Sequence, residues 1–252
     1  METRKCIVVL LLTLFVVSCS GKQAVKPPAL FDPEKAFAAA NKELEEKEYD
    51  KARTSFLEVK NRDLTKKFAP LAQLKIADSY VKEDNPELAV AEYKKFIDTY
   101  PDHQYASYAQ YQIAMIYFNQ IEDPERGYGG AAKALTEFEK LKKMFPRNPY
   151  KDVVDLKIEQ CRNVIAEYEF LVGKFYYDNK AYGAAIGRFE GLLKKFPEYR
   201  GESQVLFYAA MSYKNLKQKE KAAEHFARLI EKYPSNTLVK DAKKELSALK
   251  AK

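Results

Sequence analysis

The chain contains no tryptophan and only two histidines among its 252 residues. His103 and His225 stand apart from any cluster of His, Cys or acidic residues at ligand spacing, so we expect no metal site. No serine lies in a nucleophile elbow. Gly127, Gly129 and Ala132 match a dinucleotide fingerprint only formally, because a helix and not a strand precedes them. The sequence therefore predicts no cofactor and no catalytic site, and the protein is not expected to be an enzyme.

Cysteine is also scarce, and two of the three residues lie near the N-terminus. Arg4 and Lys5 precede an apolar run that ends at Val16-Val17-Ser18-Cys19, too short to span a bilayer as a mature helix and typical of a secretory signal. The end of this run resembles a bacterial lipobox, in which the cysteine is acylated after cleavage; an ordinary signal peptide is the alternative. Cys19 is thus the predicted lipidation site, with the protein bound to the membrane through its acyl chains.

The charge pattern and the remaining cysteine further limit the classes of protein that fit the sequence. The 43 Lys and Arg residues are interleaved with 36 acidic residues, the pattern of solvated helix faces. Together with export, this pattern excludes a nucleic-acid partner. Cys161 is the only cysteine outside the signal region, and we expect it to be a small core residue.

A repeated pattern of Ala, three residues, aromatic, two residues, Phe or Leu, three residues, aromatic, Pro organises the rest of the chain. Its four copies are AVAEYKKFIDTYP from Ala89, ALTEFEKLKKMFP from Ala134, AIGRFEGLLKKFP from Ala185 and AAEHFARLIEKYP from Ala222. An Ala and an aromatic four residues apart share one helix face, and the Pro ends the helix. Each copy is therefore predicted to be the second helix of a hairpin.

A small residue followed three positions later by Tyr precedes each copy, which predicts the first helix of each hairpin. These pairs are Ala77/Tyr80, Ala114/Tyr117, Gly173/Tyr176 and Ala210/Tyr213. The pairing resembles the tetratricopeptide repeat, although the usual Trp is missing. A degenerate first copy has Ala40, Ala52, Phe56 and Val59 at the expected spacing, with Leu64 in place of Pro. We expect an all-α solenoid of five tetratricopeptide hairpins.

Three departures from regular repeats complete the predicted organisation. Extra residues between Asn119 and Gly130 indicate a loop. A continuous apolar seam predicts one long helix over about 150–177 that packs within the solenoid, with a free-standing coiled coil as the alternative. The seam residues stand at alternating steps of four and three: Val154, Ile158, Cys161, Ile165, Tyr168, Val172 and Phe175. Asn236 to Lys250 reads as a capping helix. The predicted segments are 1–18 (lipoprotein signal peptide), 19–31 (lipidated Cys and flexible tether), 32–148 (repeats one to three) and 149–252 (long linking helix, repeats four and five, and cap).

Signal, lipobox, tether and repeats together resemble the BamD family of lipoproteins of the β-barrel assembly (BAM) machinery. The block from Tyr168 to Pro197 carries the most specific local match, with an unbroken entry helix and an Ala-Tyr opening of the second helix. The resemblance implies a non-enzymatic scaffold that binds BamA through its C-terminal repeats and unfolded outer membrane protein precursors through its N-terminal ones. Ser20, where an Asp would resemble an inner-membrane retention signal, implies the periplasmic face of the outer membrane.

Repeat spacing gives a candidate polypeptide-binding surface on the first helices of repeats one and two. The predicted residues are Phe37, Asn41, Leu44, Leu74, Asp78 and Val81, with hairpin core as the alternative for the apolar ones. Mixed apolar and polar side chains suit an extended segment with alternating residues. Arg188 lies beside the core Phe189 but about 100° round the helix, and the resemblance implies that it contacts the periplasmic domain of BamA.

Other exported repeat proteins remain open as alternatives. Lipoproteins of pilus assembly and the cell-division coordinator that partners with the Tol-Pal system carry similar repeats. The cell-division alternative is disfavoured because no coiled coil precedes the repeats. An enzyme acting on peptidoglycan is excluded by the repeats, which leave no room for a catalytic domain.

Overall fold

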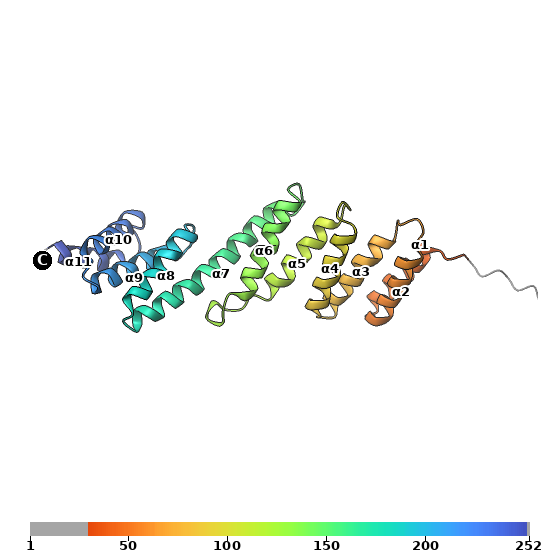
Figure 1. Cartoon of the computed structure of the whole chain (residues 1–252), viewed down its shortest axis with the longest axis horizontal. Coiled ribbons are helices and arrows are strands. Elements are labelled where there is room, and N and C mark those ends of the chain that lie inside the picture. Colours follow the sequence, from red (N-terminus) through yellow and green to blue (C-terminus); the bar gives the residue numbers. More distant parts are fainter. Residues whose placement is uncertain (1–29, 251–252) are drawn as a thin grey trace, which may run out of the picture. The chain divides into compact units, whose positions relative to one another are not determined.

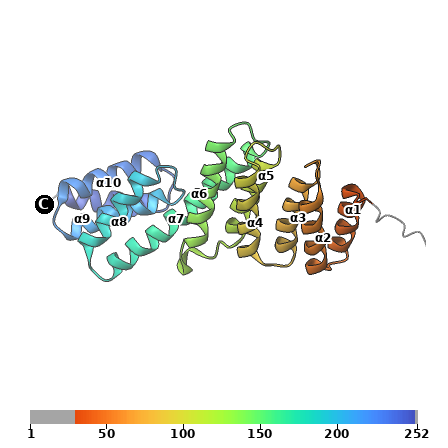
Figure 2. The ribbon, with the colours of Figure 1, turned by 45° about the vertical axis from the view of Figure 1, so that its right-hand side comes forward.

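The computed structural model describes residues 30–250, and those from Pro33 onward belong to one unit. Within the described residues there are helices and no strands, and consecutive helices pack against one another along the chain (Figures 1 and 2). The elements are α1 (Pro33–Glu45), α2 (Tyr49–Arg62), α3 (Ala69–Lys82), α4 (Pro86–Thr99), α5 (Ala106–Asn119), η1 (Pro124–Arg126), α6 (Gly129–Met144), α7 (Lys151–Asp178), α8 (Tyr182–Lys195), α9 (Glu202–Asn215), α10 (Lys219–Lys232) and α11 (Val239–Lys250). Five hairpins followed by α11 confirm the all-α tetratricopeptide architecture.

The turn inside four of the hairpins has the same conformation. Lys47, Asp84, Lys180 and Lys217 all have φ between 58° and 64°, and each stands seven residues after the small residue of its first helix. In the second hairpin the amide of Asn85 donates to the carbonyl of Tyr80 at 2.8 Å, which closes the helix end as a Schellman motif. A short left-handed turn therefore reverses the chain without glycine.

The prolines end the second helices as predicted. Tyr100, Phe145, Phe196 and Tyr233 precede the four repeat prolines, and their φ values lie between −132° and −128°. This extended conformation is the one that a following proline favours, because its ring disfavours the α region at the preceding residue. The repeat proline thus fixes both the end of the helix and the direction of the connection.

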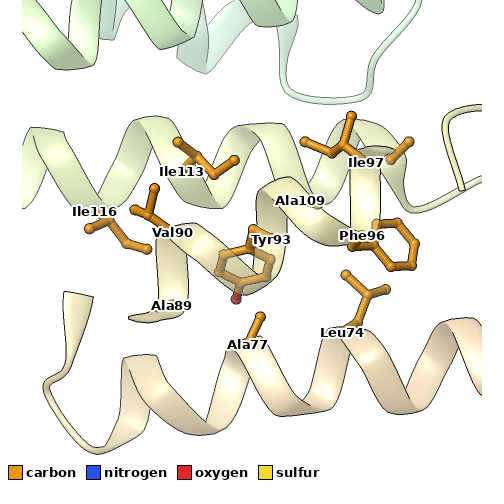
Figure 3. Packing of buried hydrophobic residues seen from close by; sticks show 11 residues of the cluster. Leu74, Ala77, Ala89, Val90, Tyr93, Phe96, Ile97, Ala109, Ile113 and Ile116 are labelled. Atoms are coloured by element: carbon orange, nitrogen blue, oxygen red, sulfur yellow. The ribbon is translucent and has the colours of Figure 1, made fainter. Parts of the chain in front are cut away.

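The repeat aromatics form the core between successive helices. In the second hairpin, Tyr93 and Phe96 of α4 lie between α3 and α5 and pack near Ala77 and Ile113 (Figure 3). Phe56, Phe138, Phe189 and Phe226 are fully buried at the equivalent places. Burial of each Phe side chain stabilises the fold by about 1.5–3 kcal/mol. Because these rings lie between successive helices, the core is a series of contacts between neighbours.

Small residues are required where two helices touch. Gly173 of α7 lies against Phe189 of α8, and a Cβ on this glycine would come within 2.5 Å of the Phe189 ring. Ala40, Ala77, Ala114 and Ala210 at the same repeat position are fully buried. The degenerate first repeat is also a packed hairpin, because Ala52, Phe56 and Val59 are fully buried while Leu64 is exposed.

The long helix forms as predicted, but its predicted apolar seam is wrong in the second half. Val154, Ile158 and Cys161 are buried against α6, whereas Phe175 is 63% exposed. The C-terminal half of α7 instead buries Ala166, Phe170 and Gly173 against α8 and α9. An α-helix drifts by about 20° per heptad relative to a 3.5-residue repeat, and α7 changes its packing partner halfway, so the buried face rotates away from the seam.

The described residues include the predicted capping helix but not the predicted signal peptide. The cap begins at Val239, where Asn236 accepts a hydrogen bond from the amide of Leu238 at 2.9 Å. The signal peptide and Cys19 lie outside the described residues. None of the helices in residues 30–250 has both the length and the apolar composition needed to cross a membrane.

Candidate partner-binding grooves

The N-terminal repeats form a groove of about 350 Å³, here called the N-terminal groove. It lies where α1 and α5 approach α3. Its lining residues are Phe37 of α1, Leu71, Leu74, Lys75 and Asp78 of α3, and Tyr105 and Tyr108 at the start of α5. The walls are therefore mostly apolar and aromatic, with one carboxylate and one ammonium group.

Asp78 is the polar centre of the N-terminal groove. The hydroxyl groups of Tyr93 and Tyr108 donate to Asp78 Oδ1 at 2.6 and 3.1 Å, and Lys75 Nζ lies 3.2 Å from Oδ2. Burial and the neighbouring Asp78 charge raise the pKa of Tyr108 to about 12 and that of Tyr93 still higher. Both hydroxyls therefore stay protonated and donate, which fixes the orientation of the carboxylate.

The six predicted polypeptide-binding residues divide into two groups. Phe37, Leu74 and Asp78 come together in the N-terminal groove, although Leu74 is largely buried in the hairpin core. Asn41 is partly buried and donates from Nδ2 to the carbonyl of Phe37 at 3.0 Å, one turn earlier on the same helix. Leu44 is a buried core residue, so its placement on an accessible surface is wrong; Val81 is exposed but does not line the groove. Tyr105 and Tyr108 were missed because they belong to the third hairpin.

The C-terminal repeats form a larger groove of about 590 Å³, here called the C-terminal groove. Its walls are the second half of α7, one face of α8 and Tyr128 before α6. The lining residues are Tyr128, Ile165, Glu169, Tyr176, Ala184, Gly187, Arg188, Gly191, Leu192, Lys195 and Phe196. On α8, Ala184, Gly187, Gly191 and Lys195 recur at steps of three and four, and Arg188 stands four residues after Ala184, which places all five on one helix face.

Arg188 lies across the C-terminal groove from Glu169. Its Nη1 donates to Glu169 Oε2 at 2.9 Å, and its side chain is 44% exposed. This hydrogen bond to Glu169 raises the pKa of the Arg188 guanidinium, so the residue is a permanent cation. Lys195 lies on the same face of α8, one turn after Gly191, and has no hydrogen-bond or ion-pair partner in residues 30–250. The groove therefore carries two cations and one carboxylate.

An apolar strip continues from the C-terminal groove along α7. It consists of Tyr168, Leu171, Val172 and Phe175, which line a second depression with Pro124 and Glu125 of η1. Tyr176 lines both hollows, and the rings of Tyr128 and Tyr168 are 4.8 Å apart. The strip was missed because the sequence pattern assigned Tyr168, Val172 and Phe175 to the buried seam of the long helix. The length of that seam was the available signal, because a single packing partner cannot cover it.

Neither groove is lined by a group of metal-ligating side chains or by a cysteine. No cluster of three or more metal-ligating side chains occurs in the described part of the chain. Cys161 is buried and unpaired, and burial raises its pKa to about 11, so its thiol is unreactive at neutral pH. Neither a metal-ligating cluster nor a reactive thiol therefore occurs among the residues that line the two grooves.

Residues 31–225 match the profile of the YfiO family, described as outer membrane lipoprotein. The chain belongs to this family. The matched region extends from before α1 into α10 and contains all lining residues of both grooves. The two grooves are thus features of the YfiO-family region of the chain rather than of its cap helix.

Several relatives of this YfiO-family chain share one name. The outer membrane protein assembly factor BamD of Caulobacter vibrioides is 25% identical over 239 residues, covering 94% of this chain and 78% of that protein. The protein of the same name from Neisseria meningitidis serogroup B is 23% identical over 251 residues, 94% of each chain. Among solved structures, the TPR2AB domain of yeast Sti1 in its pHSP90 complex aligns with 80% of this chain, with a TM-score of 0.47 and 16% identity.

Proposed function

We propose that this YfiO-family protein is a non-enzymatic scaffold for the assembly of outer membrane β-barrel proteins, anchored to the periplasmic face of the outer membrane by acyl chains on Cys19. The observation that carries the proposal is the match to relatives named outer membrane protein assembly factor BamD over 94% of the chain. In this proposal the C-terminal groove binds the periplasmic domain of BamA, and the N-terminal groove binds unfolded barrel precursors.

Depletion of the protein tests the overall function. Loss of an assembly scaffold should lower all outer membrane barrels together, because each depends on the same insertion step. Loss of pili alone, with normal barrel levels, would support a pilus-assembly lipoprotein instead. Quantitative mass spectrometry of outer membrane fractions measures both outcomes in one experiment.

Arg188 provides the test of the BamA contact. The planar guanidinium can bind a partner carboxylate at two points, which Lys cannot reproduce. Arg188→Glu should cost about 2–5 kcal/mol of complex stability if docking buries the pair, against less than about 1 kcal/mol for a rim contact. Arg200→Glu is the matched control, because Arg200 makes a similar 2.9 Å ion pair with Glu159 but does not line the groove. Co-purification of BamA after a circular dichroism check measures the effect, and undiminished recovery with Arg188→Glu removes this residue from the interface.

The N-terminal groove has the chemistry expected for an extended segment with alternating side chains. Aromatic and aliphatic walls can take one side chain, while Asp78 can accept a backbone or side-chain N–H. Photoreactive residues at Phe37, Leu71 and Tyr105 should capture unfolded barrel precursors during assembly. The same residue at Val81, which is exposed but outside the groove, should capture little; preferential capture at Val81 would place the precursor elsewhere.

The anchor is tested at Cys19. Mass spectrometry of the mature N-terminus should find an acylated cysteine at this position, and Cys19→Ala should release a folded protein from the membrane fraction. Cys161→Ala, which changes a buried thiol far along the chain, serves as the control and should leave the protein in the membrane. An unmodified N-terminus, or one that starts elsewhere, would contradict the anchor.

A further inference from the structure

The C-terminal groove is hollow where two residues of α8 on the lining face, Gly187 and Gly191, have no side chain. Gly187 and Gly191 stand one turn apart on that face, between Ala184 and Lys195. Glycine in a helix interior lowers helix stability relative to alanine. A structural reason for two glycines at these positions should therefore be visible.

The fold itself supplies no such reason. A Cβ added at Gly187 or at Gly191 would meet no atom within 4 Å apart from its chain neighbours and the nearby backbone of α8. The contrast with Gly173 is direct, since a Cβ there would collide with the ring of Phe189. Gly183 is also open on all sides, but it lies in the first turn of α8 and does not line the groove. The space above Gly187 and Gly191 is thus available to a molecule outside this unit.

The surroundings of that space define what fits into it. Ile165, Leu192 and Phe196 supply apolar walls, and Tyr128 and Tyr176 supply aromatic rings at the edge. Arg188 and Lys195 contribute two cations against the single carboxylate of Glu169, which already accepts from Arg188. A bulky apolar side chain next to a carboxylate matches both properties, because the first fills the hollow and the second meets the excess positive charge.

We infer that Gly187 and Gly191 are the seat for one bulky apolar side chain of the partner, and that a neighbouring carboxylate of the partner faces Arg188 and Lys195. This inference rests on the proposed function, in which the partner at this groove is the periplasmic domain of BamA. It adds to that proposal a specificity-determining surface on α8 and the chemistry of the segment that docks there.

Filling the seat tests the apolar half of the inference. Gly187→Leu and Gly191→Leu, each in the full-length lipoprotein in detergent, should weaken binding of the purified BamA periplasmic domain by about tenfold or more, the effect typical of a blocked hot spot. Gly183→Leu is the matched control on the same helix and should change binding less than about twofold, as expected for an energetically neutral position. Thermal melting by circular dichroism should show that all three variants keep a folded helix, since a Cβ at each position meets open space.

A pair of adjacent lysines tests the charged half. Lys195 lines the groove, whereas Lys194 is exposed beside it and does not. Lys195→Glu should weaken BamA binding by about fivefold or more and reduce its salt dependence, and Lys194→Glu should have a much smaller effect. Equal effects of the two substitutions would show that general surface charge, and not this groove, attracts the partner.

The combined outcomes separate the inference from the proposed function. If Arg188→Glu weakens binding while Gly187→Leu and Gly191→Leu do not, BamA binds near this groove without filling it, and the inference is overturned. If Gly183→Leu weakens binding as much as Gly187→Leu, the effect is one of the whole helix and the inference also fails. If none of the variants, Arg188→Glu included, changes binding, the proposed BamA contact itself is wrong.

Discussion

The N-terminal and C-terminal grooves arise from the same hairpin unit but have opposite chemistry. The N-terminal groove is centred on the carboxylate of Asp78, which tyrosine hydroxyls and a lysine hold in place. The C-terminal groove is lined by the cations Arg188 and Lys195 and by two residues without a side chain, Gly187 and Gly191. The difference shows that the core positions fix the hairpin, while the remaining positions of each helix are free to specify a partner.

The position that follows the small core residue illustrates this division. In the second hairpin it is Asp78, and in the fourth it is Lys174, which pairs with Asp178 at 2.5 Å and lies 4.9 Å from the centre of the Tyr208 ring. Ala77 and Gly173, one residue earlier, are both buried at helix contacts. The packing position therefore holds a small residue in both hairpins, whereas the next position carries a negative charge in one hairpin and a positive charge in the other.

The largest expected loss of stability is confined to the C-terminal repeats. Glu202 of α9 is 2% exposed, and its carboxylate accepts from Arg228 at 2.5 Å, from Tyr233 at 2.6 Å and from Lys232. Glu202→Ala should cost about 2–4 kcal/mol, somewhat below the loss for a fully buried pair, because Arg228 and Lys232 are half exposed and regain water. Amide hydrogen exchange should show the loss in α9 and α10.

The N-terminal helices are the internal control for Glu202→Ala. In a solenoid each repeat contacts mainly its neighbours, so exchange in α1 to α4 should stay as in the unmodified protein. Precursor capture at Phe37 should also persist while BamA binding falls. Uniform loss of protection through all helices would show that the two halves unfold as one unit and would break the comparison.

A smaller loss is expected at the centre of the N-terminal groove. Tyr93→Phe removes the 2.6 Å hydrogen bond to Asp78 and should cost about 1.5–3 kcal/mol, the usual contribution of a hydrogen bond to a charged group. Precursor crosslinking should weaken, because the carboxylate loses its orientation, while BamA binding stays unchanged. Tyr105→Phe is the control, since the hydroxyl of Tyr105 makes no hydrogen bond among the described residues; an equal loss there would show that the hydrogen bond to Asp78 is not the cause.

Acid should affect the two halves in sequence. Burial alone would raise the pKa of Glu202, but hydrogen bonds from Lys232 and Tyr233 outweigh it and lower the value. Burial is likewise outweighed at Asp63, where Thr65 and the amides of Phe68 and Ala69 lower the pKa. Both carboxylates contribute stability above their ordinary pKa values of 4.5 and 3.8, and the contribution is lost as the pH falls through the lower folded values.

The C-terminal repeats should therefore begin to lose protection at a higher pH than the N-terminal ones. Hydrogen exchange resolved by helix over an acid pH series measures the order, and the effect should be smaller than for Glu202→Ala because burial offsets part of each shift. In Glu202→Gln, which cannot ionise, the pH dependence of α9 and α10 should disappear. Loss of protection that starts in α3, where Asp63 caps the helix, would contradict this order.

Sequence pattern predicted the frame of the molecule much better than its grooves. The spacing of Ala, Phe and Pro placed the hairpins, because those positions depend on contacts within one repeat and its neighbour. The seam on α7 failed at Phe175 because burial there depends on which helix covers each half of α7, and that choice is made by tertiary packing. Tyr105 and Gly187 escaped notice for the same reason, since a groove joins residues from separate hairpins. Leu44 shows the converse, where periodicity alone did not separate a core leucine from a surface one.

The smallest predicted effect asks whether the two halves share one turn geometry. Lys217 and Asp84 both adopt the left-handed conformation, at φ 62° and 58°. Lys217→Gly should stabilise the protein by up to about 1 kcal/mol, because glycine has no Cβ to clash with the following carbonyl. Asp84→Gly should gain less, since a short polar side chain tolerates this conformation better than lysine does. Lys217→Ala keeps the Cβ and should give no gain, so urea melts of the three variants isolate the backbone contribution. A loss of stability in Lys217→Gly would mean that the lysine side chain itself supports the turn, and the hairpins of the two halves would then be alike in backbone but not in what stabilises it.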